Sequence, residues 1–133
     1  MKHVTNIMEN LLGMPDENTA GKQWAVGGDT PSATGVKFDT DKPRMDLLDP
    51  LALEGLAKVL TFGANKYASH NWRGGISYSR LIAAALRHLL AFNRGEDLDS
   101  ESNLSHIDHA ACCLMFLSNM IQTRKDLDDR YKA

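Results

Sequence analysis

The chain has 133 residues, of which 43% are hydrophobic, and a formal net charge of −2 at pH 7. This length suits one hydrophobic core but not two ordinary domains, and the charge gives no general attraction to nucleic acid or to an anionic membrane. Because no apolar run is long enough to span a bilayer or to act as a signal peptide, we expect a cytoplasmic protein with no nucleic-acid or membrane partner.

The first 34 residues are predicted to form an N-terminal arm. Residues 3–12 carry apolar side chains at helical spacing, and Gly13 and Pro15 end that pattern. Residues 13–34 are rich in Gly, Pro, Thr, Ser and Asp, which is typical of a linker, with Trp24 as a lone anchor. We therefore place the functional domain in residues 35–133.

Three helices are predicted in this domain. The segment 35–50 should be extended or turn-like, because it contains two prolines and alternating charges, and a helix should begin near Pro50. The residues expected to be buried on this first helix are Leu53, Leu56, Ala57, Leu60, Ala64 and Tyr67. On a second helix over residues 77–93 they are Leu81, Ile82, Ala85, Leu86, Leu89 and Phe92. A third helix is expected from about Ser105 to Tyr131.

These patterns predict an all-α bundle. The sequence shows no internal repeat, no strand pair joined by a hairpin turn and no βαβ alternation. Three helices bury little surface by themselves, so we expect self-association. Cys112 and Cys113 are adjacent on the third helix and cannot form an ordinary disulfide with each other, which indicates reduced thiols.

Acids and histidines are concentrated between the second and third helices. Residues 87–109 hold five of the 17 acids and three of the five histidines. The flanking apolar helices would bring the ends of this segment together as a hairpin. Carboxylates and imidazoles of this kind suit Mg²⁺ or Mn²⁺, so the segment is interpreted as a metal-dependent site. A solvated acidic loop is the alternative.

The histidines could have other roles. His88 lies on the apolar side of its helix, where it could be a hydrogen-bonded core residue or part of a site. His106, His109 and Cys113 share one helix face, a spacing that zinc tolerates, although the oxygen-rich loop favours a phosphate-bound Mg²⁺ or Mn²⁺. The imidazoles would then polarise water or neutralise phosphate charge.

Basic and aromatic residues could complete a nucleotide site. Arginines recur every seven residues at positions 73, 80, 87 and 94, and the last three line one helix face with Ala84 and Ala91 between them. Such a face is either a solvated basic stripe or a groove for a polyphosphate. At the end of the first helix an aromatic could stack on a base, or these residues could simply cap the helix. The expected substrate-binding residues are Lys37, Lys42, Lys66, Asn71, Trp72, Arg73, Arg80 and Arg87.

Four ordered motifs resemble a phage family, the dATP/dGTP diphosphohydrolases, which are related to the MazG-like all-α nucleotide pyrophosphohydrolases. The motifs are GVKFDTDKPRMDLL (35–48), LTFGANKYASHNW (60–72), LRHLLAFNRGEDLDSES (86–102) and HIDHA (106–110). The resemblance implies a MazG-like bundle completed by a homodimer or homotetramer. It also implies cleavage of a purine deoxynucleoside triphosphate between its α and β phosphates, with Mg²⁺ or Mn²⁺, in the cytoplasm of an infected host if a phage encodes the chain.

The family motifs coincide with the residues selected above. We expect the metal ligands to be Asp97, Asp99, Glu101 and His109, and the catalytic residues to be Glu96, His106 and His88. Glu96 or His106 would be the base for the attacking water. The Glu-Glu-x-x-Glu and Glu-x-x-Asp helices of typical MazG-like enzymes are absent from residues 50–120, so their ligands are not transferred.

Three rival functions remain open at this point. A non-catalytic phage protein that sequesters a nucleotide would use the same basic and aromatic groups without hydrolysis. An HD-type phosphohydrolase is suggested by His88 and the His-Ile-Asp-His run, but the adjacent His-Asp pair is missing. A purely structural helical oligomer would respond neither to divalent ions nor to nucleotides.

Overall fold

The structure is a computed structural model that describes residues 34–133, and these residues fall into two units that divide between Met45 and Asp46. The predicted helix 3–12, the linker 13–34 and Trp24 lie almost wholly outside the described residues. In the first unit, residues 34–44 contain no regular helix, and the Lys42 N–H donates to the Asp39 carbonyl at 3.0 Å, which forms a turn. This agrees with the expected turn-like segment.

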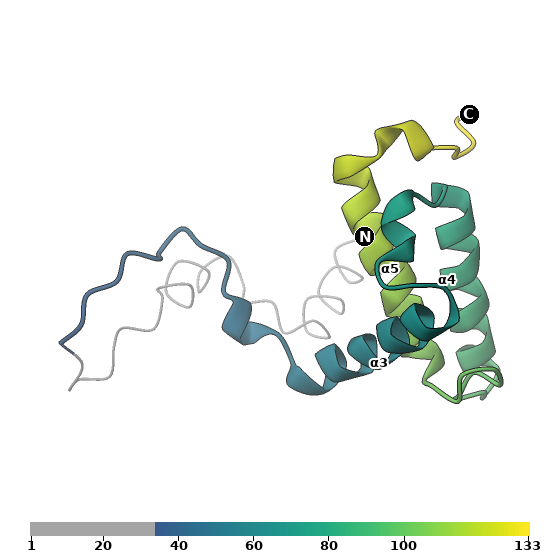
Figure 1. Cartoon of the computed structure of the whole chain (residues 1–133), viewed down its shortest axis with the longest axis horizontal. Helices are drawn as coiled ribbons and strands as arrows, with labels where there is room; N and C mark the ends of the chain where they lie inside the picture. Colours follow the sequence, from purple (N-terminus) through teal and green to yellow (C-terminus); the bar gives the residue numbers. More distant parts are fainter. Residues whose placement is uncertain (1–33) are drawn as a thin grey trace, which may run out of the picture. The chain divides into compact units, whose positions relative to one another are not determined.

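The second unit is all-α, as predicted, and its described residues contain no strand. Its α-helices are α3 (Pro50–Lys66), α4 (Tyr78–Asn93) and α5 (His106–Thr123), with short 3₁₀ turns at Met45–Leu47, Asn71–Gly74 and Lys125–Leu127. Figure 1 shows α4 and α5 side by side, while α3 crosses and contacts α5. No helix in the described part is long and apolar enough to cross a membrane.

Local sequence explains where the helices begin and end. Asp49 caps α3, because its carboxylate accepts the Ala52 N–H at 2.9 Å, and Pro50 occupies the first turn. The predicted third helix was too long at its C-terminal end. At Arg124 the backbone leaves the helical region (φ −137°, ψ 58°), and the Arg124 side chain instead binds the Gly74 carbonyl and Asp126.

The core lies between α4 and α5. Tyr78, Leu81 and Met120 are almost fully buried, and the Tyr78 hydroxyl donates to the Met120 carbonyl at 3.1 Å. The partly buried Trp72 and Phe116 pack against this cluster. The loop between α3 and α4 is therefore held on the helix pair by large side chains.

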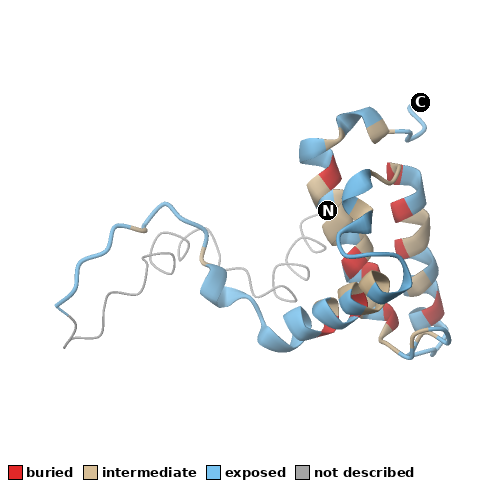
Figure 2. Cartoon of the chain, viewed as in Figure 1, coloured by how far each residue is buried: buried red, intermediate tan, exposed pale blue. Residues whose placement is uncertain are grey.

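The predicted buried faces were wrong in part. On α3 the buried residues are Gly55 and Val59, whereas Leu53 and Tyr67 are exposed. On α4, Leu86, Leu89 and Phe92 are also exposed. Figure 2 shows the buried positions of α4 as a narrow stripe, because among residues 34–133 only α5 covers α4 extensively.

Candidate metal and nucleotide site

The loop of residues 94–105 closes the α4–α5 hairpin and carries the acids at its mouth, as predicted. Gly95 (φ 95°) and Asn103 (φ 58°) take left-handed backbone conformations that make the loop compact. The Asp99 N–H donates to the Leu104 carbonyl at 2.8 Å, and the His106 N–H donates to the Asp97 carbonyl at 3.1 Å. These bonds hold the acidic segment against the start of α5.

The three histidines of the two helices meet beside this loop. Nδ1 of His88 on α4 lies 2.9 Å from Nδ1 of His106 on α5. The His88 ring also stacks on the His109 ring, with centroids 4.6 Å apart and planes 12° apart. The two helices thus gather imidazoles that the sequence separates by about twenty positions.

Asp99 is fixed through one of its two carboxylate oxygens. Its Oδ2 accepts the backbone N–H groups of Glu101 (3.2 Å) and Ser102 (2.9 Å) and the Ser102 hydroxyl (2.9 Å). Within the described part of the chain, Oδ1 accepts no hydrogen bond, so it is available to a ligand. Although partial burial opposes ionisation, the bonds from Ser102 keep the pKa of Asp99 below its ordinary value.

Ser102 links Asp99 to His109. The Ser102 Oγ lies 2.7 Å from His109 Nε2, and since its own proton goes to the Asp99 carboxylate, it must accept the His109 N–H. This assigns the proton of neutral His109 to Nε2. His109 Nε2 is 3.9 Å from Asp99 Oδ2, which is too far for a hydrogen bond, so its hydrogen-bond partner is Ser102.

Burial controls the charge of two of the histidines. Burial, with further contributions from the neighbouring imidazoles, lowers the pKa of both His88 and His109 below the ordinary value of 6.5. Both rings are therefore neutral near pH 7, the form in which an imidazole can bind a metal ion.

His106 has a buried nitrogen without a partner. The residue is only 6% exposed, and its Nε2 makes no hydrogen bond in the structure. The nearest charged group that it faces is Glu96, whose Oε2 lies 4.0 Å away. A buried nitrogen without a hydrogen bond lowers the stability of the folded state by about 1–3 kcal/mol. Such groups in native proteins often belong to a functional site.

Three of these residues form a possible metal-binding group. One ligand atom each from His88, Asp99 and His106 lie within 4.8 Å of one another. Among the described residues, no such group contains Cys113, so the zinc set of His106, His109 and Cys113 is not assembled. Two imidazoles and a carboxylate with an oxygen free of hydrogen bonds in the described residues are a donor set that suits a metal ion.

A cleft of about 740 Å³ opens beside this group, between α3, the 67–76 loop and α5. This volume is within the range of small-molecule sites. Of the sequence-predicted residues, the structure brings the following to its wall: Lys66, Asn71, Trp72, Arg73, His88, Asp99, Glu101 and His109. Lys66 forms an ion pair with Glu101 at the cleft, which raises the pKa of the lysine.

Trp72 lies on the cleft wall, but its ring already has two partners. One contact is a stack on Phe116, with centroids 4.6 Å apart, and the Arg73 guanidinium lies 4.5 Å from the ring centroid. The more exposed aromatic is Tyr67, which is 66% exposed, lines the same cleft and has the Lys66 ammonium 5.4 Å from its ring centroid. The geometry favours Tyr67 over Trp72 as a stacking surface for a base.

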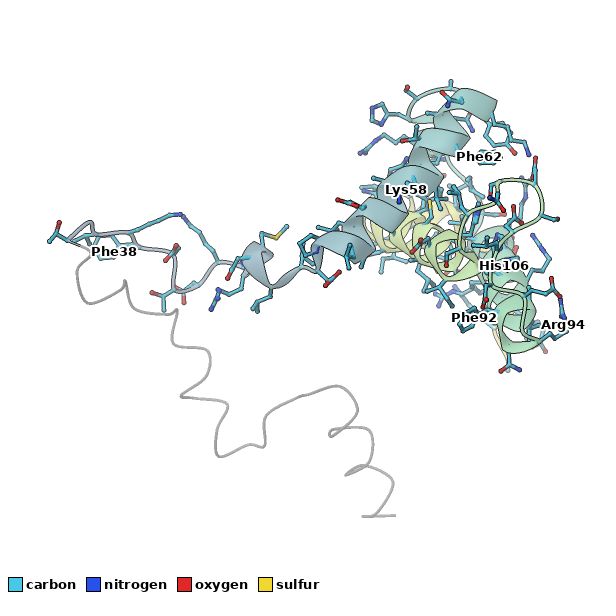
Figure 3. All side chains as sticks on the ribbon, turned by 90° about the horizontal axis from the view of Figure 1, so that it is seen from below. Phe38, Lys58, Phe62, Phe92, Arg94 and His106 are labelled. Carbon is cyan, nitrogen blue, oxygen red and sulfur yellow. The ribbon has the colours of Figure 1, made fainter. Side chains whose placement is uncertain are left out.

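The remaining predicted residues lie elsewhere. Arg80 and Arg87 flank a second groove of about 360 Å³, floored by Ala83 and Ala84. Arg94 pairs with Glu96 at 3.2 Å, and Figure 3 shows it at the outer end of the helix pair, with His106 further inward. The Asp97 carboxylate makes no bond within the described residues. Lys37 and Lys42 belong to the first unit, and Lys37 pairs with Asp39 at 3.5 Å.

Ser102 was not among the site residues predicted from the sequence. Its signal was present, because an Asp that precedes a Ser by three positions often caps the intervening backbone. Tyr67 was assigned to the buried stripe because its helical spacing continued the apolar pattern, although it was also one of the residues at the end of the first helix that could stack on a base.

Comparison with known proteins identifies relatives. The sequence model of the family described as "dATP/dGTP diphosphohydrolase, N-terminal" matches residues 32–130. A dATP/dGTP diphosphohydrolase of Salmonella phage PMBT28 is 41% identical over 97 residues, which is 73% of this chain and 33% of the relative. The match thus spans about one third of that relative's length. No solved structure matches the chain.

Proposed function

The chain belongs to the dATP/dGTP diphosphohydrolase family, and from this membership we propose that it hydrolyses purine deoxynucleoside triphosphates to the monophosphate and pyrophosphate. The observation that carries the proposal is the His88, Asp99 and His106 group at the edge of a nucleotide-sized cleft. The phage relative supports a role in phage nucleotide metabolism.

The metal of this site is proposed to be a divalent cation, Mg²⁺ or Mn²⁺. When bound, it would offset the negative charge that develops on the phosphates during transfer. Asp99 contributes its free Oδ1, and Glu101 and His109 flank the same wall of the cleft. Asp97 would have to turn inward to take part, because its side chain is exposed.

Residues of the chain would position the other reactants. Lys66 would exchange its ion pair with Glu101 for a phosphate oxygen, and Asn71 would offer its amide to the base or sugar. We assign the role of general base to Glu96, because its Oε2 lies 4.0 Å from Nε2 of His106, which belongs to the metal group. A water at the α-phosphorus would lose a proton as the bond to the bridging oxygen breaks, which releases pyrophosphate.

Self-association is proposed as well. Exposed apolar side chains on α4 include Leu86, Leu89, Leu90 and Phe92, and α5 exposes Leu114 and Ile121. Faces of this size in a small chain are typical of interfaces between subunits. Light scattering coupled to gel filtration should give a dimer or tetramer, and a monomer at micromolar concentration would contradict it.

Product analysis in ¹⁸O-water tests the activity. The protein is incubated with each deoxynucleoside and ribonucleoside triphosphate, with Mg²⁺, Mn²⁺ or chelator, and the products are separated by ion exchange. We expect metal-dependent monophosphate and pyrophosphate from dATP and dGTP, with ¹⁸O in the monophosphate, because water attacks the α-phosphorus. Asp99→Asn is the matched inactive variant.

Intact nucleotides under every condition would overturn the enzymatic proposal. If calorimetry then showed dATP or dGTP binding without turnover, the protein would be a sequestering nucleotide binder. ¹⁸O in pyrophosphate would instead place the attack on the β-phosphorus.

A further inference from the structure

We propose that His88, Asp99 and His106 form a nitrogen-rich metal site that selects a first-row transition-metal ion, such as Mn²⁺, Fe²⁺ or Co²⁺, over Mg²⁺. The inference deepens the proposed function by naming the metal class of the same site. It rests on three independent features: the spacing of the ligand atoms, the anchoring of Asp99 and the environment of the imidazoles.

The spacing of the two imidazoles matches neighbouring positions around one ion. Two nitrogens bound at about 2.1 Å and at a right angle are about 3.0 Å apart. The Nδ1 atoms of His88 and His106 are 2.9 Å apart. The ligand atoms of all three residues lie within 4.8 Å of one another, so a shift of up to about 1.8 Å, taken up by the Asp99 side chain, brings them to the spacing of about 3.0 Å of neighbouring ligands around one ion.

Asp99 is oriented like a carboxylate ligand. Three donors hold its Oδ2, and the same side chain keeps Oδ1 without a hydrogen bond in the described part. An oxygen of this carboxylate lies within 4.8 Å of a ring nitrogen of His88 and of His106. Metal-binding carboxylates are usually hydrogen-bonded through the oxygen that does not face the ion.

The surroundings of the histidines also fit metal binding. If the Nδ1 atoms of His88 and His106 face an ion, the proton of His106 must reside on Nε2. That buried nitrogen then becomes a hydrogen-bond donor, and the nearest carboxylate oxygen, Oε2 of Glu96, is 4.0 Å away. A movement of the Glu96 side chain by about 1 Å would form the hydrogen bond. The stacked ring of His109 keeps the plane of His88 in place.

The choice of metal follows from the ligand atoms. Mg²⁺ prefers oxygen ligands and retains its water, whereas imidazole nitrogens favour first-row transition metals. Two imidazoles with one carboxylate match the facial set of Fe²⁺ sites, which leaves other positions open for phosphate oxygens and water. A site made only of the loop carboxylates would favour Mg²⁺ instead.

Metal binding to the full-length protein, without substrate, tests the inference. Mn²⁺ is titrated and the free ion is followed by electron paramagnetic resonance, with Mg²⁺ as competitor. Electron spin-echo modulation of the bound Mn²⁺ then reports directly bound nitrogen. We expect one tight Mn²⁺ per chain, ¹⁴N modulation, and at least tenfold weaker binding of Mg²⁺.

Variants assign the ligands. His88→Gln and Asp99→Asn should weaken Mn²⁺ binding by at least about 100-fold, and Ser102→Ala, which removes an anchor of Asp99, by about 10-fold. His70→Asn is the matched control, since His70 is an exposed histidine outside the group and asparagine tolerates its left-handed backbone. Circular dichroism of each metal-free variant checks that it is folded.

Three results would overturn the site: no Mn²⁺ bound at millimolar concentration, bound Mn²⁺ without nitrogen modulation, or equal affinity for Mg²⁺. Because the measurement contains no nucleotide, it is independent of hydrolysis. If the protein binds Mn²⁺ through nitrogen but leaves dATP and dGTP intact, this inference stands and the proposed function is wrong. If it hydrolyses dATP and dGTP but binds Mn²⁺ without nitrogen ligands, the proposed function stands and this inference is wrong.

Discussion

Gly55 of α3 lies directly against the carboxylate of Asp108 on α5: a β-carbon at position 55 would come within 2.4 Å of Asp108 Oδ2. This close approach is part of the α3–α5 contact, and α3 forms one wall of the cleft. The absence of a side chain at position 55 therefore decides how near α3 can come to the start of α5.

Gly55→Ala should destabilise the fold by about 1–2 kcal/mol, because the carboxylate of Asp108 must move away from the added methyl group. In the Asp108→Ala background the same change should be neutral or stabilising by up to about 1 kcal/mol, since alanine favours the helix. Urea unfolding of the four proteins of this cycle measures both effects. Equal costs of Gly55→Ala in the two backgrounds would show that the contact has no energetic role.

The aromatic residues of the cleft should separate into a structural and a binding role. Trp72→Ala should cost about 2–3 kcal/mol of stability, because it removes the stack on Phe116. Tyr67→Ala should change stability by less than about 0.5 kcal/mol, yet weaken dATP and dGTP binding by about tenfold if Tyr67 stacks on the base. Thermal unfolding and calorimetric titration measure these two effects separately.

The control for that pair is Trp72→Phe, which retains an aromatic ring on Phe116 and should keep most of the stability. If Tyr67→Ala bound both nucleotides as well as the unaltered protein, the base would not lie on this residue.

Lys66 and Glu101 should respond differently to substitution. Lys66→Met should raise KM for dATP and dGTP about tenfold, because a phosphate contact is lost, with a smaller change in kcat. Glu101→Gln should lower kcat and also weaken metal binding, as expected of a metal ligand. Lys58→Met is the matched control: Lys58 is an exposed lysine on the same helix outside the cleft lining (Figure 3). Turnover that survives Glu101→Gln would remove Glu101 from the metal site.

The two cysteines should react at different rates. Burial raises the pKa of Cys112 to about 12, and also raises the pKa of the less buried Cys113. At pH 8 only about one Cys112 in ten thousand is a thiolate. As long as the pH is below the pKa, this fraction rises about tenfold for each unit by which the pH is raised. Iodoacetamide should therefore label Cys113 first, as mass spectrometry of the digested protein can show.

Nucleotide should slow the labelling of Cys113, because Cys113 lines the cleft. Labelling of both cysteines at one rate in the folded protein would contradict the burial of Cys112. Labelling of Cys113 that is indifferent to dATP and dGTP would place the nucleotide elsewhere.

The sequence alone determined the features that depend on neighbouring residues. The α3 start at Pro50 follows from the Asp49 cap, and the extent of α4 follows from an uninterrupted apolar pattern. The gathering of acids between two apolar helices was likewise visible, because a short hairpin loop must bring both of its ends together. Family membership also followed from linear motifs, since these are carried in chain order.

Only the tertiary structure decided which of those groups meet. The 2.9 Å contact between His88 and His106 depends on how α4 packs along α5, and the link from Asp99 through Ser102 to His109 depends on the left-handed turn at Asn103. Helical periodicity also misassigned Tyr67, because burial depends on which helix covers which face. A periodic pattern defines a possible apolar side of a helix, whereas the packing of the other helices determines whether that side is covered.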